Sequence, residues 1–247
     1  SYAMYLAVLG SMIHGLTVPG SIEAAQRRKG YTNGLFEWLR KAPWGDPGFS
    51  ANVFSIIIFG FIGGITGVTI GTEQINIIVH NTLRVPGHFH ATVVVGTTLA
   101  FMSLTYFLIP VLFRRKVMFA GMAKWQPYVF GISMAGLCLF MMGAGTLGVP
   151  RRHWDITFAG NIFPYEFPGT AMLMMGLVGI CALGAFVGGA MYLAVTVCSV
   201  FIGEKIQTPE FAHVSAKQGV APAPQPVAAT VGSAHGNIGA GGMVAPG

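Results

Sequence analysis

The sequence contains one closely spaced pair of histidines, His88 and His90, which directly follows Pro86-Gly87. Proline is favoured in the first turn of a helix, so we expect His88 to enter a helix at once. An α-helix turns by about 100° per residue, so the two imidazoles point in nearly opposite directions. Such ligands suit two metals better than one, and imidazole is a standard axial ligand of haem iron. The spacing suggests a helix placed between two haems and linked through Phe89; the alternative is an interfacial pair satisfied by water or carbonyl groups.

The elements that position this pair are predicted to be membrane-spanning helices. The chain is 53% hydrophobic and only 9% charged, whereas a soluble domain carries about 25% charged residues. This leaves too little polar surface to face water on all sides, so lipid is the expected solvent. A backbone in lipid must satisfy its own hydrogen bonds, and no barrel-like alternation is present, so helices are expected. We predict an all-α membrane helix bundle with five spanning helices, at roughly 2–22, 51–70, 91–113, 127–149 and 171–202.

The placement of charge predicts the orientation of these helices. If the five helices alternate in direction, eleven of the 14 Lys and Arg residues fall on one side, which the positive-inside rule assigns to the cytoplasm. Residue 1 is then expected outside and the C-terminus inside. Residues 1–206 form the membrane region, in which 35–40 is predicted to be a short interfacial helix, and 207–247 are expected to be a flexible tail rich in Ala, Pro and Gly. The basic residues on the other side are Arg84, Arg151 and Arg152.

Three motifs of the sequence resemble a single protein family. The runs His80-Asn81-Thr82 and Val85-Pro86-Gly87-His88-Phe89-His90 resemble subunit I of the haem-copper oxidases, and the B-type branch most closely. The run Gly34-Leu35-Phe36-x-Trp38-x-Arg40-x-x-Pro43-Trp44 resembles a cytoplasmic loop of that branch, and Val149-Pro150-Arg151-Arg152 resembles the family's paired-arginine signature. Order and spacing agree for all three motifs over roughly residues 5 to 200. The resemblance implies family helices eight to twelve of a twelve-helix fold, which is the C-terminal half of the subunit.

The resemblance implies roles for the histidine pair and for the paired arginines. His88 corresponds to the axial ligand of the high-spin haem at the oxygen site, and His90 corresponds to a ligand of the low-spin haem. Arg151 and Arg152 correspond to residues that bind haem propionates, and Arg pairs well with carboxylates. Bound propionates would explain why these arginines lie on the side that is poor in positive charge. Arg84 has no counterpart in the motifs, so we expect it to be a membrane anchor or a partner contact.

Polar residues before the histidine pair depart from parts of the family pattern. His80 and Asn81 stand where A-type members have a His-Asp pair at an outer metal and water cluster, and losing the carboxylate weakens a magnesium site. His80 is a candidate proton-release group near the propionates, or a helix-end histidine satisfied by water. Asn76 stands where family members usually have Asp beside the propionate of the high-spin haem. An amide does not titrate, so proton storage is not expected there.

A polar face on the first predicted helix suggests a route for protons. Ser11, His14, Thr17 and Ser21 follow one another at steps of three or four residues, so they share one helix face. In the family this face lines the proton channel that serves the oxygen site. His14 lies where the A-type branch has lysine and the B-type branch has threonine, and an imidazole can relay protons. The alternative is helix packing through small polar residues, with His14 bonded to a neighbour.

The resemblance also implies cofactors, partners and a function. The cofactors are a low-spin haem of b or a type, a high-spin a-type haem and copper (CuB), whose ligands belong to upstream family helices. The implied partners are therefore the N-terminal half of subunit I, which lies on this or another chain, and subunit II with a dinuclear copper centre. The implied electron donor is a cytochrome c or a small copper protein. Membrane lipid is a further partner, and no nucleic acid is expected. The implied function is that of a terminal respiratory oxidase, which reduces O2 to water with proton translocation in a bacterial or archaeal plasma membrane.

Two other functions stay open at this stage. One is a nitric oxide reductase-like member of the same superfamily, although its equivalent helix usually has a different sequence around the histidines. The other is a non-enzymatic haem-binding membrane subunit that only transfers electrons, because the family's copper ligands are not found in this sequence.

Overall fold

The fold was analysed in a computed structural model, which describes residues 2–152 and 166–207. The described part consists of helices and connecting segments, and it contains five helices that are long and apolar enough to cross a membrane. The predicted all-α bundle with five spanning helices is therefore confirmed. The spanning helices are Tyr5–Arg28, Pro47–Gly71, Arg84–Leu112, Ala120–Thr146 and Gly169–Ile202. Most of the predicted 207–247 tail lies outside the described residues, so the proposed division of the chain stays a prediction.

The observed helices begin earlier or end later than the apolar runs that predicted them. The first, α1 (Tyr2–Arg28), continues through polar residues to a last turn with two arginines. The third continuous helical segment begins at Arg84, seven residues before the predicted start at 91. Charged side chains at membrane level can extend to the interface, so a helix does not have to end where its apolar run ends.

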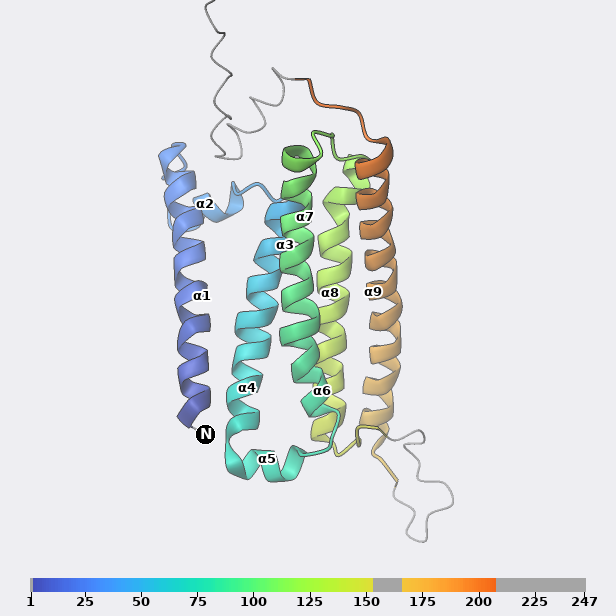
Figure 1. The fold of residues 1–247 in the computed structure, drawn as a ribbon. Coiled ribbons are helices and arrows are strands. Elements are labelled where there is room, and N and C mark those ends of the chain that lie inside the picture. The colour runs from blue at the N-terminus through green and yellow to red at the C-terminus, as the bar shows by residue number, and fades with distance from the viewer. Residues whose placement is uncertain (1, 153–165, 208–247) are drawn as a thin grey trace, which may run out of the picture.

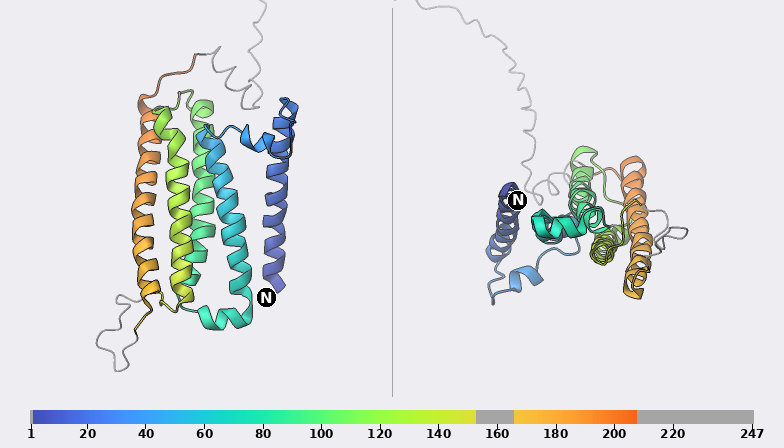
Figure 2. Two further views of the ribbon diagram at one scale, coloured as in Figure 1. Left: turned by 180° about the vertical axis from the view of Figure 1, so that it is seen from behind. Right: turned by 90° about the horizontal axis from the view of Figure 1, so that it is seen from below.

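The spanning helices stand side by side in an open row, with α1 at one edge and α9 (Gly169–Ile202) at the other (Figures 1 and 2). Among the spanning helices, α1 packs against the second, at η1 (Ile57–Gly63) and α4 (Gly64–Gly71), whereas α8 (Ala120–Thr146) and α9 pack together extensively. The main core cluster joins the middle helices to α8 and α9 through residues such as Ile58, Leu99 and Cys138, which are fully or almost fully buried. This core gives the histidine-bearing helix a firm support on one side.

The second and third spanning helices each contain a π-helical segment. The second consists of α3 (Pro47–Ile56), η1 (Ile57–Gly63) and α4 (Gly64–Gly71). The third consists of α6 (Arg84–Phe89), η2 (His90–Thr97) and α7 (Thr98–Leu112). The π segments pack against each other so closely that a Cβ on Gly63 would lie 2.6 Å from Thr92 Cγ2, and one on Gly96 would lie 2.7 Å from Phe59. Isolated π-helical turns often occur at functional sites, and the second of these begins at His90.

The connections gather at two ends of the bundle. The first end, which we call the basic end, carries the short helix α2 (Glu37–Arg40), the α7–α8 connection and the exit of α9 (Figure 1). The predicted helix in the first connection is thus present, although it is shorter than 35–40. The opposite end, which we call the histidine end, carries α5 (Glu73–Val79), the start of α6 and the end of α8. His80 and His88 both lie toward this end.

Candidate functional site

The histidine pair lies at the junction between α6 and η2. Pro86 is the third residue of α6, where its missing N–H is not needed for a helical bond, and its place in the first turn agrees with the expected early entry into the helix. His88 belongs to the short α-helix, and His90 is the first residue of the π-helix. Both side chains are half-buried, whereas Phe89 between them is 55% exposed. The two histidines therefore lie in different helical geometries, although they are only two residues apart in the sequence.

The imidazole of His88 faces the neighbouring spanning helix. Its Nδ1 lies 3.0 Å from the hydroxyl oxygen of Thr66 on α4. That hydroxyl also lies within hydrogen-bonding distance of the carbonyl oxygens of Ile62 and Gly63, which can only accept. The hydroxyl proton therefore goes to a carbonyl, and the oxygen accepts from His88 Nδ1–H. This tautomer leaves the lone pair of Nε2 available for a metal.

The imidazole of His90 is held in a different way, by its own helix. Its Nδ1 lies 2.7 Å from the carbonyl oxygen of Pro86. A carbonyl oxygen is only an acceptor, so Nδ1 carries the proton and Nε2 again keeps its lone pair. Metal-ligating histidines commonly donate their second ring N–H to such a carbonyl. Both histidines are thus prepared as Nε2 ligands, one by an adjacent helix and one by the preceding turn.

A glycine on α4 makes room for the His88 ring. A Cβ on Gly67 would lie 3.0 Å from His88 Cε1, so a side chain at this position would displace the imidazole. His88 also borders a cavity of about 230 Å³, which lies between α1, the η1–α4 segment and the α6–η2 segment. Ser11 of α1 lines the same cavity. The ring is therefore close-packed on the Gly67 side and borders open space.

The polar face of α1 leads toward this cavity. Ser11 and His14 line a second cavity of about 530 Å³ together with Asn52 and Ser55, and Ser11 borders both cavities. His14 itself is exposed in the described chain. Farther along α1, the Ser21 hydroxyl donates to the Thr17 carbonyl oxygen over 2.7 Å. The structure thus brings Ser11 to the cavity that His88 borders, and it places His14, Thr17 and Ser21 progressively nearer the basic end.

The paired arginines are tied to the loop that contains His80 and Asn81. The backbone N–H of Arg151 donates to the Asn81 carbonyl oxygen over 2.8 Å, next to an antiparallel bridge between Thr82 and Pro150. The Arg151 guanidinium also donates to Asn81 Oδ1 from Nη2 at 2.8 Å and from Nε at 3.2 Å. His80 is exposed at the end of α5, one residue before this contact. Residues 70 positions apart are thereby held together at the histidine end.

Two further polar residues organise the same end. Asn76 Nδ2 donates to the carbonyl oxygen of Ile70 over 3.0 Å, which joins α5 to the end of α4. Arg84 donates to hydroxyl oxygens on two other helices, from Nη1 to Thr146 at 2.7 Å and from Nη2 to Thr69 at 3.3 Å. The sequence prediction missed Thr66, Thr69 and Thr146 as partners. Their signal is weak, because single threonines within apolar runs are common in packed membrane helices.

The described residues contain no group of three or more His, Cys, Asp or Glu side chains that could together hold a metal ion. The donor chemistry of the histidine end is instead that of single imidazoles with guanidinium groups nearby. Single imidazoles suit the axial positions of haem iron, and guanidinium groups suit the carboxylates of haem. The free Nε2 atoms of both rings and the cavity bordered by His88 fit haem as the ligand.

The comparisons with known proteins agree with this fold. The five spanning helices define a multi-pass membrane protein. A family model described as "Cytochrome C and Quinol oxidase polypeptide I" matches residues 1–202. The chain therefore belongs to this family, and the resemblance to subunit I of the haem-copper oxidases is confirmed.

Individual relatives show how much of the family's length is present. The chain is 35% identical over 185 residues to cytochrome c oxidase subunit 1 of Thermus thermophilus, covering 72% of this chain and 32% of the relative. It is 30% identical over 122 residues to quinol oxidase subunit 1 of Bacillus subtilis, covering 48% and 18%. A chain from the cryo-EM structure of a heme-copper terminal oxidase dimer is similar with a TM-score of 0.72 and 29% identity, covering 82% of this chain and 36% of that one. This chain thus spans about a third of the length of the first relative.

Proposed function

We propose that this chain is the C-terminal part of the catalytic subunit of a terminal respiratory oxidase. The observation that carries the proposal is the pair His88 and His90, whose Nδ1 atoms are bonded to Thr66 and to Pro86 so that both Nε2 atoms are left free. In this proposal His88 is the axial ligand of a high-spin haem and His90 is a ligand of a low-spin haem. When bound, the two haems and a copper ion would supply the electron transfer and oxygen chemistry that turn O2 into water.

The chain's own residues prepare the ligands before any cofactor binds. The Thr66 hydroxyl and the Pro86 carbonyl select the Nδ1–H tautomer at each ring, and hydrogen bonds of this type typically matter about 10–100-fold in metal affinity. Phe89 lies between the two ligands in the sequence and so keeps the path between them short. Arg151, Arg152 and Arg84 bring positive charge to the end of the bundle at which we place the haem carboxylates.

The polar face of α1 is proposed to deliver protons to the site beside His88. The support is that Ser11 and His14 line one cavity and that Ser11 also lines the cavity bordered by His88. An imidazole such as that of His14 can accept a proton at one ring nitrogen and donate one from the other. His80, exposed beside Arg151, is the proposed release group at the other end of the path. Asn76 has an amide that donates to a carbonyl oxygen, so it takes a structural role in this account.

The remaining parts of the proposal concern the complex. The copper ligands and the second low-spin ligand are assigned to the N-terminal half of subunit I. The electron donor is assigned to cytochrome c or a small copper protein that acts through subunit II. The basic end is assigned to the cytoplasm of a bacterial or archaeal cell, since it holds ten of the 13 Lys and Arg residues that the structure describes.

Spectra of the purified complex that contains this chain test the proposal. A reduced-minus-oxidised spectrum with two haem species, one of which binds carbon monoxide, is the expected result, with one copper ion per high-spin haem at that site. A complex with only a low-spin haem would instead support the electron carrier. Uptake of O2 rather than nitric oxide distinguishes the oxidase from the nitric oxide reductase-like alternative.

A further inference from the structure

Arg84 is a half-buried cation that neither the sequence motifs nor the proposed haem ligands explain. It is the first residue of α6, and its guanidinium lies between α4 and α8. Two of its nitrogen atoms donate to the hydroxyl oxygens of Thr146 and Thr69. Its Nε is buried and has no hydrogen-bond partner. One N–H of a fully charged group is thus left unsatisfied away from water.

Such an arrangement calls for an anion. A guanidinium stays protonated in proteins, and hydroxyl oxygens are neutral acceptors that do not balance its charge. None of the described carboxylates forms an ion pair with Arg84, so its charge has no counter-ion among the described residues.

The place of Arg84 relative to His88 indicates which anion this is. Arg84 precedes His88 by four residues, so both lie on one face of α6, with Arg84 about 6 Å nearer the histidine end. Both contact α4: His88 reaches Thr66, Arg84 reaches Thr69, and the Thr69 hydroxyl donates to the Thr66 carbonyl oxygen over 2.8 Å. A haem carries its two carboxylates on one edge of the ring. A cation one helical turn from the axial ligand, on the ligand's own face, is suited to that edge.

The backbone of Arg84 is also held tightly in place. A Cβ on Gly145 of α8 would lie 1.9 Å from the Arg84 nitrogen, and a Cβ on Gly87 would lie 2.6 Å from Met142 Cγ. Glycines at both positions therefore allow α6 and α8 to approach closely around Arg84. A cation fixed in this way loses little conformational freedom on binding a ligand, which favours charge-assisted hydrogen bonds.

We propose, on the basis of the proposed function, that Arg84 binds a carboxylate of the haem whose iron is ligated by His88. The buried Nε–H is the donor available to this carboxylate, while Nη1 and Nη2 keep the guanidinium between α8 and α4. The site thus has a third arginine besides Arg151 and Arg152, and this one lies on the axial ligand's own helix.

The midpoint potential of the carbon monoxide-binding haem tests this assignment. In the purified complex, Arg84→Gln keeps a hydrogen-bonding side chain but removes the positive charge that favours the reduced iron. We expect both haems to remain, and the reduced-to-oxidised ratio of the high-spin haem at a fixed potential to fall about tenfold, which is 59 mV for one electron. The low-spin haem should shift less, and Arg84→Lys should recover part of the potential.

Two controls separate this role from a structural tether between helices. Thr146→Val removes the acceptor of Nη1 but keeps the charge, so it should leave the potential close to that of the wild type. Arg28→Gln removes an exposed charge at the basic end and should leave both potentials unchanged. Equal shifts for Arg84→Gln and Thr146→Val, or no shift in Arg84→Gln, would overturn the proposal.

Infrared difference spectra identify the source of the carboxylate. Cells supplied with a haem precursor labelled with ¹³C in its carboxyl carbons give labelled haem propionates and unlabelled protein side chains. Arg84→Gln should shift labelled carboxylate bands, whereas a shift confined to unlabelled bands would assign the anion to a side chain and contradict the proposal. A wild-type complex without any carbon monoxide-binding haem would instead contradict the proposed function itself.

Discussion

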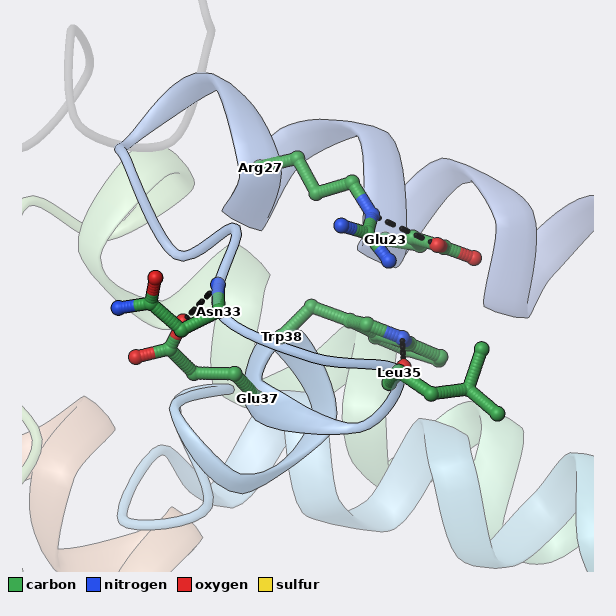
Figure 3. A network of polar contacts seen from close by, with 6 residues as sticks. All are labelled: Glu23, Arg27, Asn33, Leu35, Glu37 and Trp38. Atoms are coloured by element: carbon green, nitrogen blue, oxygen red, sulfur yellow. Dashed lines mark hydrogen bonds and ion pairs between the residues drawn. The ribbon is translucent and has the colours of Figure 1, made fainter.

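The two ends of the bundle use charged side chains in different ways. At the basic end, cations lie beside carboxylates: Arg27 pairs with Glu23 four residues earlier on α1 (Figure 3), and Lys116 pairs with Glu204 beyond α9. At the histidine end, the guanidinium groups bond to neutral oxygens, since Arg84 donates to two threonine hydroxyls and Arg151 donates to the amide oxygen of Asn81. Ion pairs on a surface are typically worth about 0–1 kcal/mol. Neutral oxygens hold a guanidinium in place without balancing its charge, so that charge stays available to an anionic ligand.

This difference suggests that charge at the basic end serves orientation in the membrane, whereas charge at the histidine end serves binding. Substitutions at the histidine end should therefore alter haem spectra or turnover, and substitutions at the basic end should not.

The largest effect is expected where a side chain would displace the His88 ring. In Gly67→Val the new Cβ would lie 3.0 Å from His88 Cε1, and the two methyl groups of valine add further bulk. We expect about a 10–100-fold loss of affinity for the high-spin haem, measured as carbon monoxide-binding haem per complex. Gly60→Val is the matched control on the same spanning helix, because nothing lies within 4 Å of its Cβ. Equal haem loss in both variants would contradict the role of Gly67.

A large effect on rate, without loss of haem, is expected at the polar face of α1. His14→Leu removes the proposed proton relay beside the cavity shared with Ser11. Steady-state oxygen uptake should fall about tenfold or more, while both haem spectra stay as in the wild type. Ile13→Leu, one residue away on the same helix, serves as the control. Unchanged uptake in His14→Leu would assign this histidine to packing.

A moderate effect on stability is expected at the contact between Asn81 and Arg151. Asn81→Ala removes the oxygen that accepts from the Arg151 guanidinium. Because Asn81 has φ 62°, the alanine must also adopt a left-handed conformation, which costs about 1–2 kcal/mol. Asn81→Gly loses the same acceptor without that conformational cost. Alanine should therefore lower the temperature of haem loss on heating more than glycine does. An unchanged temperature in both variants would show that this contact does not support the site.

The smallest effect is expected at the basic end. Arg27→Gln removes a partly exposed ion pair between residues four apart on α1, and such helical pairs are worth about 0.3–0.5 kcal/mol. Haem content, potentials and oxygen uptake should match the wild type, and thermal stability should change only slightly. A clear change in haem potential would end the distinction between the two ends.

The sequence predicted the helices well because the thickness of the bilayer sets the length of the apolar run that a spanning helix needs. It also predicted that His88 lies within a helix directly after Pro86-Gly87, because proline is favoured in the first helical turn. The π-helical segments at Ile57–Gly63 and His90–Thr97 were not predicted, because local propensity does not distinguish them from α-helix. They depend on how two neighbouring helices pack.

The partners of the site residues were equally beyond the sequence. Thr66 and Gly67 meet His88 only because α4 and α6 pack in one particular register. Arg84 was expected to be a membrane anchor or a partner contact. Its position between α4 and α8 could not be predicted, because it depends on the close approach of α8 at Gly145. Contacts between residues 15 to 70 positions apart leave no periodic pattern to detect.

The most direct test of the central claim compares His88→Ala and His90→Ala in the same purified complex. The account predicts reciprocal losses: His88→Ala abolishes carbon monoxide binding while the low-spin spectrum persists, and His90→Ala removes the low-spin spectrum while carbon monoxide still binds. If either substitution removes both haems equally, or neither, the two imidazoles do not serve separate irons and the account is contradicted.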